Sequence, residues 1–274
     1  MKRSIQYRIM IWDTITKELR SKMLLFVFIV SSVIILLSHS LVKIFFSSVG
    51  APDSGSPLNS GALLLSVMFG FLNFWSVIIA AIFGVNSIRS DFSQNIIYQY
   101  LAMPIKRSDY YFSRLLGTWA IVYMFYLYAY MASLILFSIA THSWVAHWGH
   151  LLSALCMGIF IFLCILFSTL LSFFGNRIAA LLMVGITWLT LTLSNSAFRE
   201  IPYNDYFVNF SLLRFLGMVV HWLLPRLGNV SELANIFLFK KDLTMNLWIE
   251  TPHLIITTAL LLWIAIRFIK KKDF

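Results

Sequence analysis

The chain alternates between long apolar runs and short polar stretches. A helix that crosses a bilayer needs about 20 mostly apolar residues, and six runs are close to this length or longer. These runs cover residues 23–46, 62–86, 115–140, 151–174, 178–196 and 247–269. The pattern predicts an all-α membrane protein with six transmembrane helices that form one domain, residues 1–274.

The first 22 residues are too polar to cross a membrane. Their apolar residues recur at steps of three and four, which places them on one side of a helix. They are Ile5, Ile9, Trp12, Ile15 and Leu19. Residues 1–22 therefore favour a helix that lies in the interface plane. A solvated lead-in to the first span is the alternative.

The polar stretch before the last span, residues 197–246, contains one apolar segment at 207–224. This segment carries Arg214 and His221, and Pro225 ends it. Charged groups are costly inside lipid, so a seventh span is disfavoured. We expect an extracytoplasmic helix that is either interfacial or re-entrant.

Charge is distributed unevenly between the two sides that six spans define. The N-terminus, residues 87–114, the turn at 175–177 and the C-terminal tail hold most of the 21 basic residues. The entire formal charge of +10 falls on that side. Basic loops face the cytoplasm, so both termini are predicted to be cytoplasmic. This explains the positive charge without nucleic acid, for which no binding motif is present.

Composition excludes a soluble fold for this chain. Of its 274 residues, 60% are hydrophobic and only 12% are charged, whereas soluble domains carry roughly 25% charged residues. Lipid accepts the apolar side chains that a domain of this length could not bury.

Residues suited to catalysis or metal binding are sparse. The chain has no Gly-x-Ser-x-Gly, HExxH or Gly-x4-Gly-Lys-Ser/Thr motif. His142, His147 and His150 lie among tryptophans at a predicted membrane boundary, with no acidic or cysteine partner nearby. They favour an aromatic belt over a metal site. We expect no enzyme activity, no metal and no cofactor bound by this chain.

The loop at residues 87–114 is the longest polar connection between two spans on the predicted cytoplasmic side. Its apolar residues Phe92, Ile96, Ile97 and Tyr100 recur at intervals typical of a short amphipathic helix, which Pro104 ends. The apolar face of such a helix has to be covered. It either packs under the bundle or docks on a partner, and periodicity does not decide between them.

Four segments resemble the permeases of type-2 ABC exporters. They are TKELRSKMLLF, residues 16–26; RSDFSQNIIYQYLAMPIKRSDYYFSRLLG, residues 89–117; LLPRLGNVSEL, residues 223–233; and FIKKKDF, residues 268–274. The family has an acidic residue after its second span, a Leu-x-x-Pro-x-x-Arg motif, and a basic residue and a glycine at its third span. The matching residues are Asp91, Leu101, Pro104, Arg107, Arg114 and Gly117. Asp91 stands where the family more often has glutamate.

The resemblance implies a permease that works with cytoplasmic ABC ATPase subunits on separate chains. The partner ATPase would bind ATP and Mg, and the permease would pair with a second copy or a related half-permease. Export of an amphipathic substrate across a bacterial inner or cytoplasmic membrane is the implied activity. The alternative is a subunit that transmits force to an extracytoplasmic partner and moves no free solute. A lipid-modifying enzyme is less consistent with the missing catalytic motifs.

The resemblance also implies roles for particular residues. ATPase coupling is expected at Asp91, Phe92, Ile96, Ile97, Tyr100, Pro104 and Arg107. Polar residues on the second and fifth spans are expected to line a substrate path: Asn73, Thr187, Thr190 and Ser194. The small residues Ala80 and Gly84 lie near Asn73 and are typical of close helix contacts, here expected beside the central path of a dimer.

Overall fold

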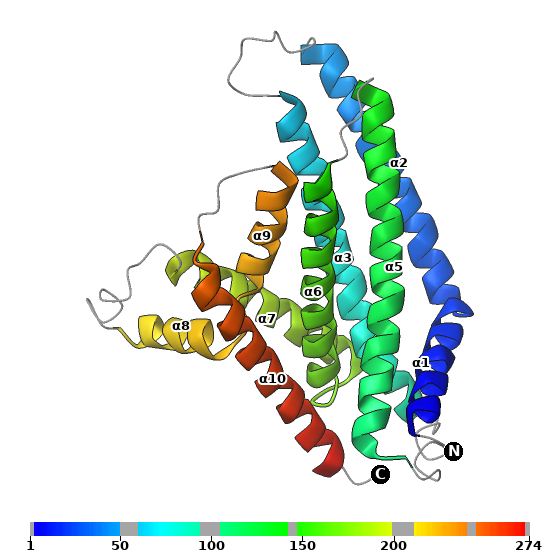
Figure 1. Ribbon diagram of the computed structural model, residues 1–274, viewed down its shortest axis with the longest axis vertical. Coiled ribbons are helices and arrows are strands. Elements are labelled where there is room, and N and C mark those ends of the chain that lie inside the picture. The colour runs from blue at the N-terminus through cyan, green and yellow to red at the C-terminus, as the bar shows by residue number, and fades with distance from the viewer. Residues whose placement is uncertain are drawn as a thin grey trace.

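The computed structural model describes residues 3–49, 60–93, 105–141, 147–198, 211–239 and 245–271, and every element in them is a helix (Figure 1). The helices are α1 Arg3–Leu19, α2 Lys22–Val49, α3 Ser60–Ser93, α5 Arg107–Thr141, α6 Trp148–Leu171, α7 Arg177–Phe198, α8 Leu212–Leu223, α9 Leu227–Phe239 and α10 Leu247–Lys271. The all-α prediction is confirmed for these residues.

Among the described residues, five helices are long and apolar enough to cross a membrane: α3, α5, α6, α7 and α10. The count rises to six if α1 and α2, which meet at a bend of 63°, are taken as one broken span. These helices fit an integral membrane protein. With 28 residues, α2 is about 42 Å long and could cross by itself, so we treat α1 as lying outside the spans. The arrangement of six spans stays a prediction.

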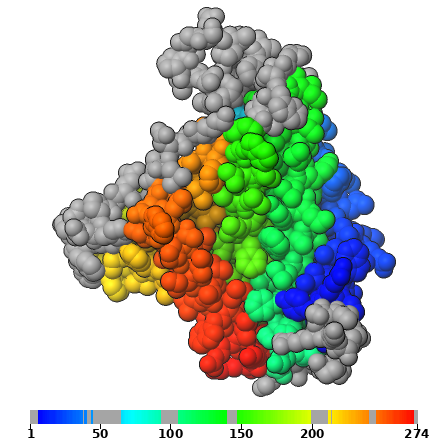
Figure 2. All heavy atoms as spheres, viewed as in Figure 1, coloured from blue at the N-terminus to red at the C-terminus, as the bar shows by residue number. Residues whose placement is uncertain are grey.

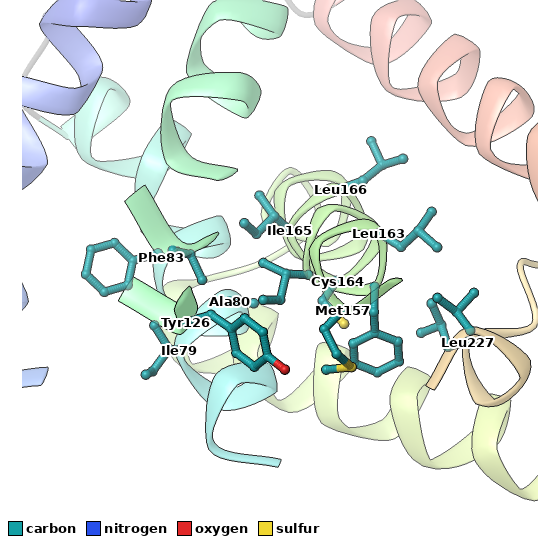
Figure 3. Close-up of a cluster of buried hydrophobic side chains, with 14 of the residues drawn as sticks. Ile79, Ala80, Phe83, Tyr126, Met157, Leu163, Cys164, Ile165, Leu166 and Leu227 are labelled. Atoms are coloured by element: carbon teal, nitrogen blue, oxygen red, sulfur yellow. The ribbon is translucent and has the colours of Figure 1, made fainter. Parts of the chain in front are cut away.

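Helix α6 is the centre of the bundle. Figure 3 shows α6 side chains surrounded by Ile79, Ala80 and Phe83 of α3, Tyr126 of α5 and Leu227 of α9. All five of these neighbours are buried. Most of the α6 side chains are buried as well, so this helix has little surface left for lipid.

The small residues of α3 make a contact within the chain. A Cβ atom added at Gly84 would lie 2.6 Å from Cβ of Ser168 on α6, and Ala80 is fully buried. This contact accounts for the small residues within one chain, and a central path of a dimer beside α3 stays a prediction. Small residues let two backbones approach, and the backbones that approach here are those of α3 and α6.

Helix α1 is amphipathic as predicted, but both of its faces have a role. The apolar residues Ile9 and Trp12 are exposed, which fits contact with a membrane surface. The opposite face, with Met10 and Thr14, is buried. Its partner is α5, against which α1 lies near the end of the bundle that carries both termini (Figure 2).

The polar stretch at 87–114 is more helical than expected. Helix α3 continues to Ser93 and α5 begins at Arg107, so both spans extend well beyond the predicted ends at 86 and 115. Their polar ends are stabilised by ion pairs with other helices, which local sequence does not reveal. The predicted coupling helix falls largely on residues 94–104, which lie outside the described residues.

The described part of residues 197–246 contains two helices between α7 and α10, whereas the sequence predicted one. The predicted segment 207–224 contains α8, whose N-cap Ser211 accepts a hydrogen bond from the backbone N–H of Arg214 at 3.2 Å. The second helix, α9, was not predicted. It packs along α6 on the half of the bundle away from the termini (Figure 1).

Candidate functional site

A fully buried carboxylate, Asp91, lies in the last turn of α3. Its Oδ1 atom is 2.5 Å from Nζ of Lys17, and its Oδ2 atom is 2.6 Å from Nη2 of Arg114. The Tyr110 hydroxyl also donates to Oδ2, at 2.6 Å. Three donors from α1 and α5 therefore converge on one carboxylate of α3. We call Lys17, Asp91, Tyr110 and Arg114 the Asp91 cluster.

This position is unfavourable for an isolated acid. The C-terminal end of a helix carries partial negative charge, and burial removes the water that would solvate the carboxylate. Two cations and a hydroxyl compensate for both effects. Tyr110 and Arg114 are one turn apart on α5 and so share a face. The cluster therefore depends on α1, α3 and α5 being held in one arrangement.

Arg114 connects the cluster to a second part of α1. Its Nη1 atom donates to the Thr14 hydroxyl at 3.0 Å and lies 3.9 Å from the exposed carboxylate of Asp13. Directly beside this contact, a Cβ atom at Gly117 would lie only 2.6 Å from Cβ of Thr14. The absence of a side chain at Gly117 is what lets α1 come this close to α5.

A second acid of α1, Glu18, is buried next to the cluster, with 4% of its surface exposed. Burial is the main reason that the pKa of its carboxyl is raised above the ordinary 4.5. Lys17 and Arg114 oppose this shift, and Asp91 adds to it. An acid of α1 with a raised pKa therefore lies beside the ion-paired carboxylate of α3.

Two further arginines connect helix ends on this side of the molecule. Arg89 of α3 donates to the carbonyl of Ser172 at 3.0 Å and to that of Gly175, in the turn between α6 and α7. Arg107 of α5 donates to the carbonyl of Lys270 of α10 at 3.0 Å. Side chains of α3 and α5 therefore connect these two helices to each other, to the turn between α6 and α7, and to the end of α10. The arrangement suits mechanical connection, since its ion pairs and hydrogen bonds join separate helices.

The predicted coupling residues have different surroundings. Asp91 is inside the molecule, Phe92 is partly buried against the core, and Arg107 contacts α10. Four others lie outside the described residues: Ile96, Ile97, Tyr100 and Pro104. Asp91 and Arg107 thus join α3 and α5, the helices that flank the predicted docking segment in the sequence, to other helices.

The predicted path residues are not gathered in one cavity. Asn73 accepts a hydrogen bond from the Tyr126 hydroxyl at 3.2 Å. On α7, Thr187 and Thr190 each donate to a carbonyl of their own helix at 2.8 Å. Ser194 is buried and donates to the carbonyl of Gly217 in α8 at 2.8 Å.

The two helices that carry the path residues do meet. The ring of Phe74, next to Asn73, is 6.1 Å from that of Trp188, next to Thr187. Thr190 and Ser194 line an open groove between α7 and α8 that also includes Arg214. The residues of the predicted path therefore divide between an α3–α7 contact and this groove.

Sequence reasoning missed Lys17, the α1 member of the Asp91 cluster. Lys17 and Asp91 are separated by 74 positions, and nothing local marks Lys17 as a partner. It also missed the pair of Arg226 and Glu250, whose atoms lie 2.6 Å apart. Arg226 directly follows Pro225 in the sequence, but nothing local marks it as buried or as a partner of Glu250.

The histidines at the predicted boundary form a ring cluster. His147 and His150 have ring centroids 4.4 Å apart, and Nδ1 of His150 lies 3.1 Å from the Tyr130 hydroxyl. His142 lies outside the described residues. Within the described ranges, no group of three or more His, Cys, Asp or Glu side chains could hold a metal ion.

Comparison with known proteins adds no family assignment. Neither the protein-family models nor the curated proteins include a match to this chain. The resemblance to type-2 ABC exporter permeases therefore rests on the motifs quoted above.

Proposed function

We propose that this protein is the permease subunit of an ABC transporter, driven by a separate cytoplasmic ATPase. The observation that carries the proposal is the position of the Asp91 cluster. It lies at the end of α3, directly before the segment at residues 94–104 whose pattern and family resemblance favour ATPase docking. The end of the bundle with both termini would then face the cytoplasm, as the charge distribution predicts.

The cluster supports force transmission in a specific way. A push on residues 94–104 reaches α3 through Asp91 and α5 through Arg107 and Arg114. The short, charge-assisted contacts between these helices are stronger than neutral hydrogen bonds. Because Lys17 joins the same carboxylate, α1 would move with α3 and α5. The three helices would respond as one body to ATP-driven closure of the partner.

A second permease copy is part of the proposal. Helix α7 exposes large apolar side chains along most of its length, including Ile178, Leu182, Ile186 and Leu193. Lipid or a second copy could cover them, and the resemblance favours a second copy or a half-permease. ATP and Mg²⁺ would bind to the ATPase, and the exported substrate would be amphipathic.

The test is co-purification from native membranes. A tagged chain should retain a protein that contains a phosphate-binding loop, and the complex should hydrolyse ATP. The change Ile97→Asp should remove most of the bound ATPase, because it places a charge on the apolar face expected to dock. The matched control is Ser54→Asp, which adds the same charge to a polar loop predicted on the opposite side.

Two results would contradict the proposal. One is the absence of any ATP-hydrolysing partner from the purified native complex. The other is normal ATPase retention and turnover in the Ile97→Asp variant, which would make the segment a plain connector.

A further inference from the structure

A second buried ion pair lies where α8, α9 and α10 meet, apart from the Asp91 cluster. Arg226, just before α9, is 5% exposed, and its Nη1 atom is 2.6 Å from Oε1 of Glu250 in the first turn of α10. Its guanidinium also lies over the Trp222 ring, 4.9 Å from the centroid. Nε of Arg226 donates to the carbonyl of His221 at 3.3 Å.

A cavity of about 50 Å³ adjoins this ion pair. Its wall includes Arg226, Asn229, Leu233, Glu250, His253 and Leu254. A single water needs roughly 10–15 Å³ by a comparable measure, so the cavity has room for a group larger than one water. Leu233 and Leu254 add an apolar surface beside the polar one.

Several polar atoms around the cavity lack a hydrogen-bond partner within the described part of the chain. They are Nη2 of Arg226, Oδ1 of Asn229 and Nδ1 of His253. Arg226 and Asn229 are both at least nine-tenths buried, where an unsatisfied polar atom is costly. A bound group that satisfies both would be stabilised for that reason.

The hydrogen-bonding capacity of Arg226 and Asn229 indicates which chemical group would fit the cavity. Arg226 offers a donor and Asn229 an acceptor, and a hydroxyl can accept from one while it donates to the other. The charges of Arg226 and Glu250 cancel, so a carboxylate would approach Glu250 unfavourably and an ammonium group would approach Arg226 unfavourably. The apolar wall suits an alkyl chain attached to the hydroxyl.

We propose that the cavity between α9 and α10 binds the hydroxyl group of an uncharged amphiphile. The cavity lies in this chain alone, and its binding does not depend on an ATPase or on transport. The inference therefore goes beyond the proposed function and can fail or succeed separately from it.

The experiment uses the full chain in lipid nanodiscs and a photoactivatable long-chain alcohol with its diazirine close to the hydroxyl. After illumination, mass spectrometry locates the label. We expect labelling of peptides that contain Asn229 and Leu254. Dodecanol at about ten times its dissociation constant should reduce this labelling about tenfold, because it occupies the same site, whereas dodecanoate and dodecyltrimethylammonium should compete weakly.

A variant pair tests the acceptor. Asn229→Leu keeps the number of side-chain heavy atoms and the branch at Cγ but removes Oδ1, and should weaken labelling about tenfold. Asn235→Leu makes the same change on the same helix, at a residue outside the cavity wall, and should leave labelling unchanged.

The competition arm uses the unaltered chain, so it decides the matter even if a variant misfolds. Equal competition by the three amphiphiles would mean general contact with lipid and would overturn the proposal. Labelling confined to other helices would mean that the cavity holds only water, and would also overturn it.

Discussion

At the scale of single residues, Asp91 shows how burial turns a common side chain into a structural requirement. A carboxylate on a solvated loop can lose its charge at little cost. Asp91 is instead fully buried and faces Lys17, Tyr110 and Arg114. Removing one member of a buried ion pair leaves the others without compensation, which costs more than the pair itself contributes.

Asp91→Asn should destabilise the protein by about 3–5 kcal/mol, because it removes the closest counter-ion of the buried Arg114 and the carboxylate that pairs with Lys17. Thermal unfolding in detergent would measure the loss. Asp13→Asn is the control, since Asp13 is about half exposed and lies 3.9 Å from Arg114. That change should cost at most about 1 kcal/mol, and equal effects of the two variants would contradict the central role of Asp91.

Glu18 predicts a dependence of stability on pH. Because its pKa is raised in the folded state, folding takes up a proton in the range between 4.5 and that raised value. Stability from this group therefore rises as pH falls through the raised pKa, and the gain is complete below 4.5. Glu18→Gln should unfold at a higher temperature than the parent at about pH 7, with the difference shrinking toward acid.

The difference in melting temperature between the parent and Glu18→Gln, measured across pH, reports on Glu18 alone, because both proteins contain all the other acids. A constant difference between parent and Glu18→Gln from neutral to acid pH would show that Glu18 does not titrate in this range.

At the scale of elements, the crossing of α1 and α5 depends on one residue without a side chain. Thr14 occupies the space that a Cβ atom of Gly117 would need. The same close approach brings Arg114 within hydrogen-bond distance of Thr14. Backbone approach and charge pairing at this crossing therefore stabilise the same arrangement.

Gly117→Ala should push α1 away from α5 and destabilise the protein by about 1–3 kcal/mol, as overpacking does in a tight contact. Gly70→Ala on α3 is the matched control, because a Cβ atom there meets nothing within 4 Å. It should be neutral or slightly stabilising, since alanine favours helix more than glycine does. Melting temperatures of both variants give the comparison, and similar shifts would mean that the crossing is not tight.

The long helices could be predicted from the sequence, but the short helix α9 and the side-chain contacts between helices could not. Apolar runs give the spans because lipid requires such runs. Helix α9 was missed because it is short and interrupted by Asn229 and Asn235. The Asp91 cluster was missed in part because Lys17 is distant in sequence and pairs only after folding. Of the candidate site, Asp91 and Arg114 were identified through the family pattern, but their pairing was not.

At the scale of the whole molecule, α1 begins and α10 ends at one end of the bundle, where α3 also ends and α5 begins (Figure 1). The Asp91 cluster belongs to the ends of α3 and α5. Most basic residues of the sequence lie in the stretches predicted to be cytoplasmic: the N-terminus, residues 87–114, the turn at 175–177 and the C-terminal tail. Positive charge favours retention in the cytoplasm, so the arrangement of helices and the distribution of charge lead to one expected orientation.

We predict six spans with both termini cytoplasmic. Tags at the two termini should be inaccessible from outside intact cells, while single cysteines at Ser54 and Asn204 should react with a reagent that cannot cross the membrane. Permeabilised cells provide the control for tag exposure. A C-terminus accessible in intact cells would overturn the topology.

Helix α2 is attached to the bundle mainly through its first half, so it could tilt about that contact. Among the described side chains of α2, the buried ones are Val27, Ser31 and Ile35, all in its first half. Ser31 accepts a hydrogen bond from the Trp75 indole at 2.6 Å. About 18 residues of α2, or roughly 27 Å, extend beyond Ser31 to Val49, so a tilt of about 10° around this contact would move the far end by roughly 5 Å. Small displacements near the termini would thus be amplified across the membrane.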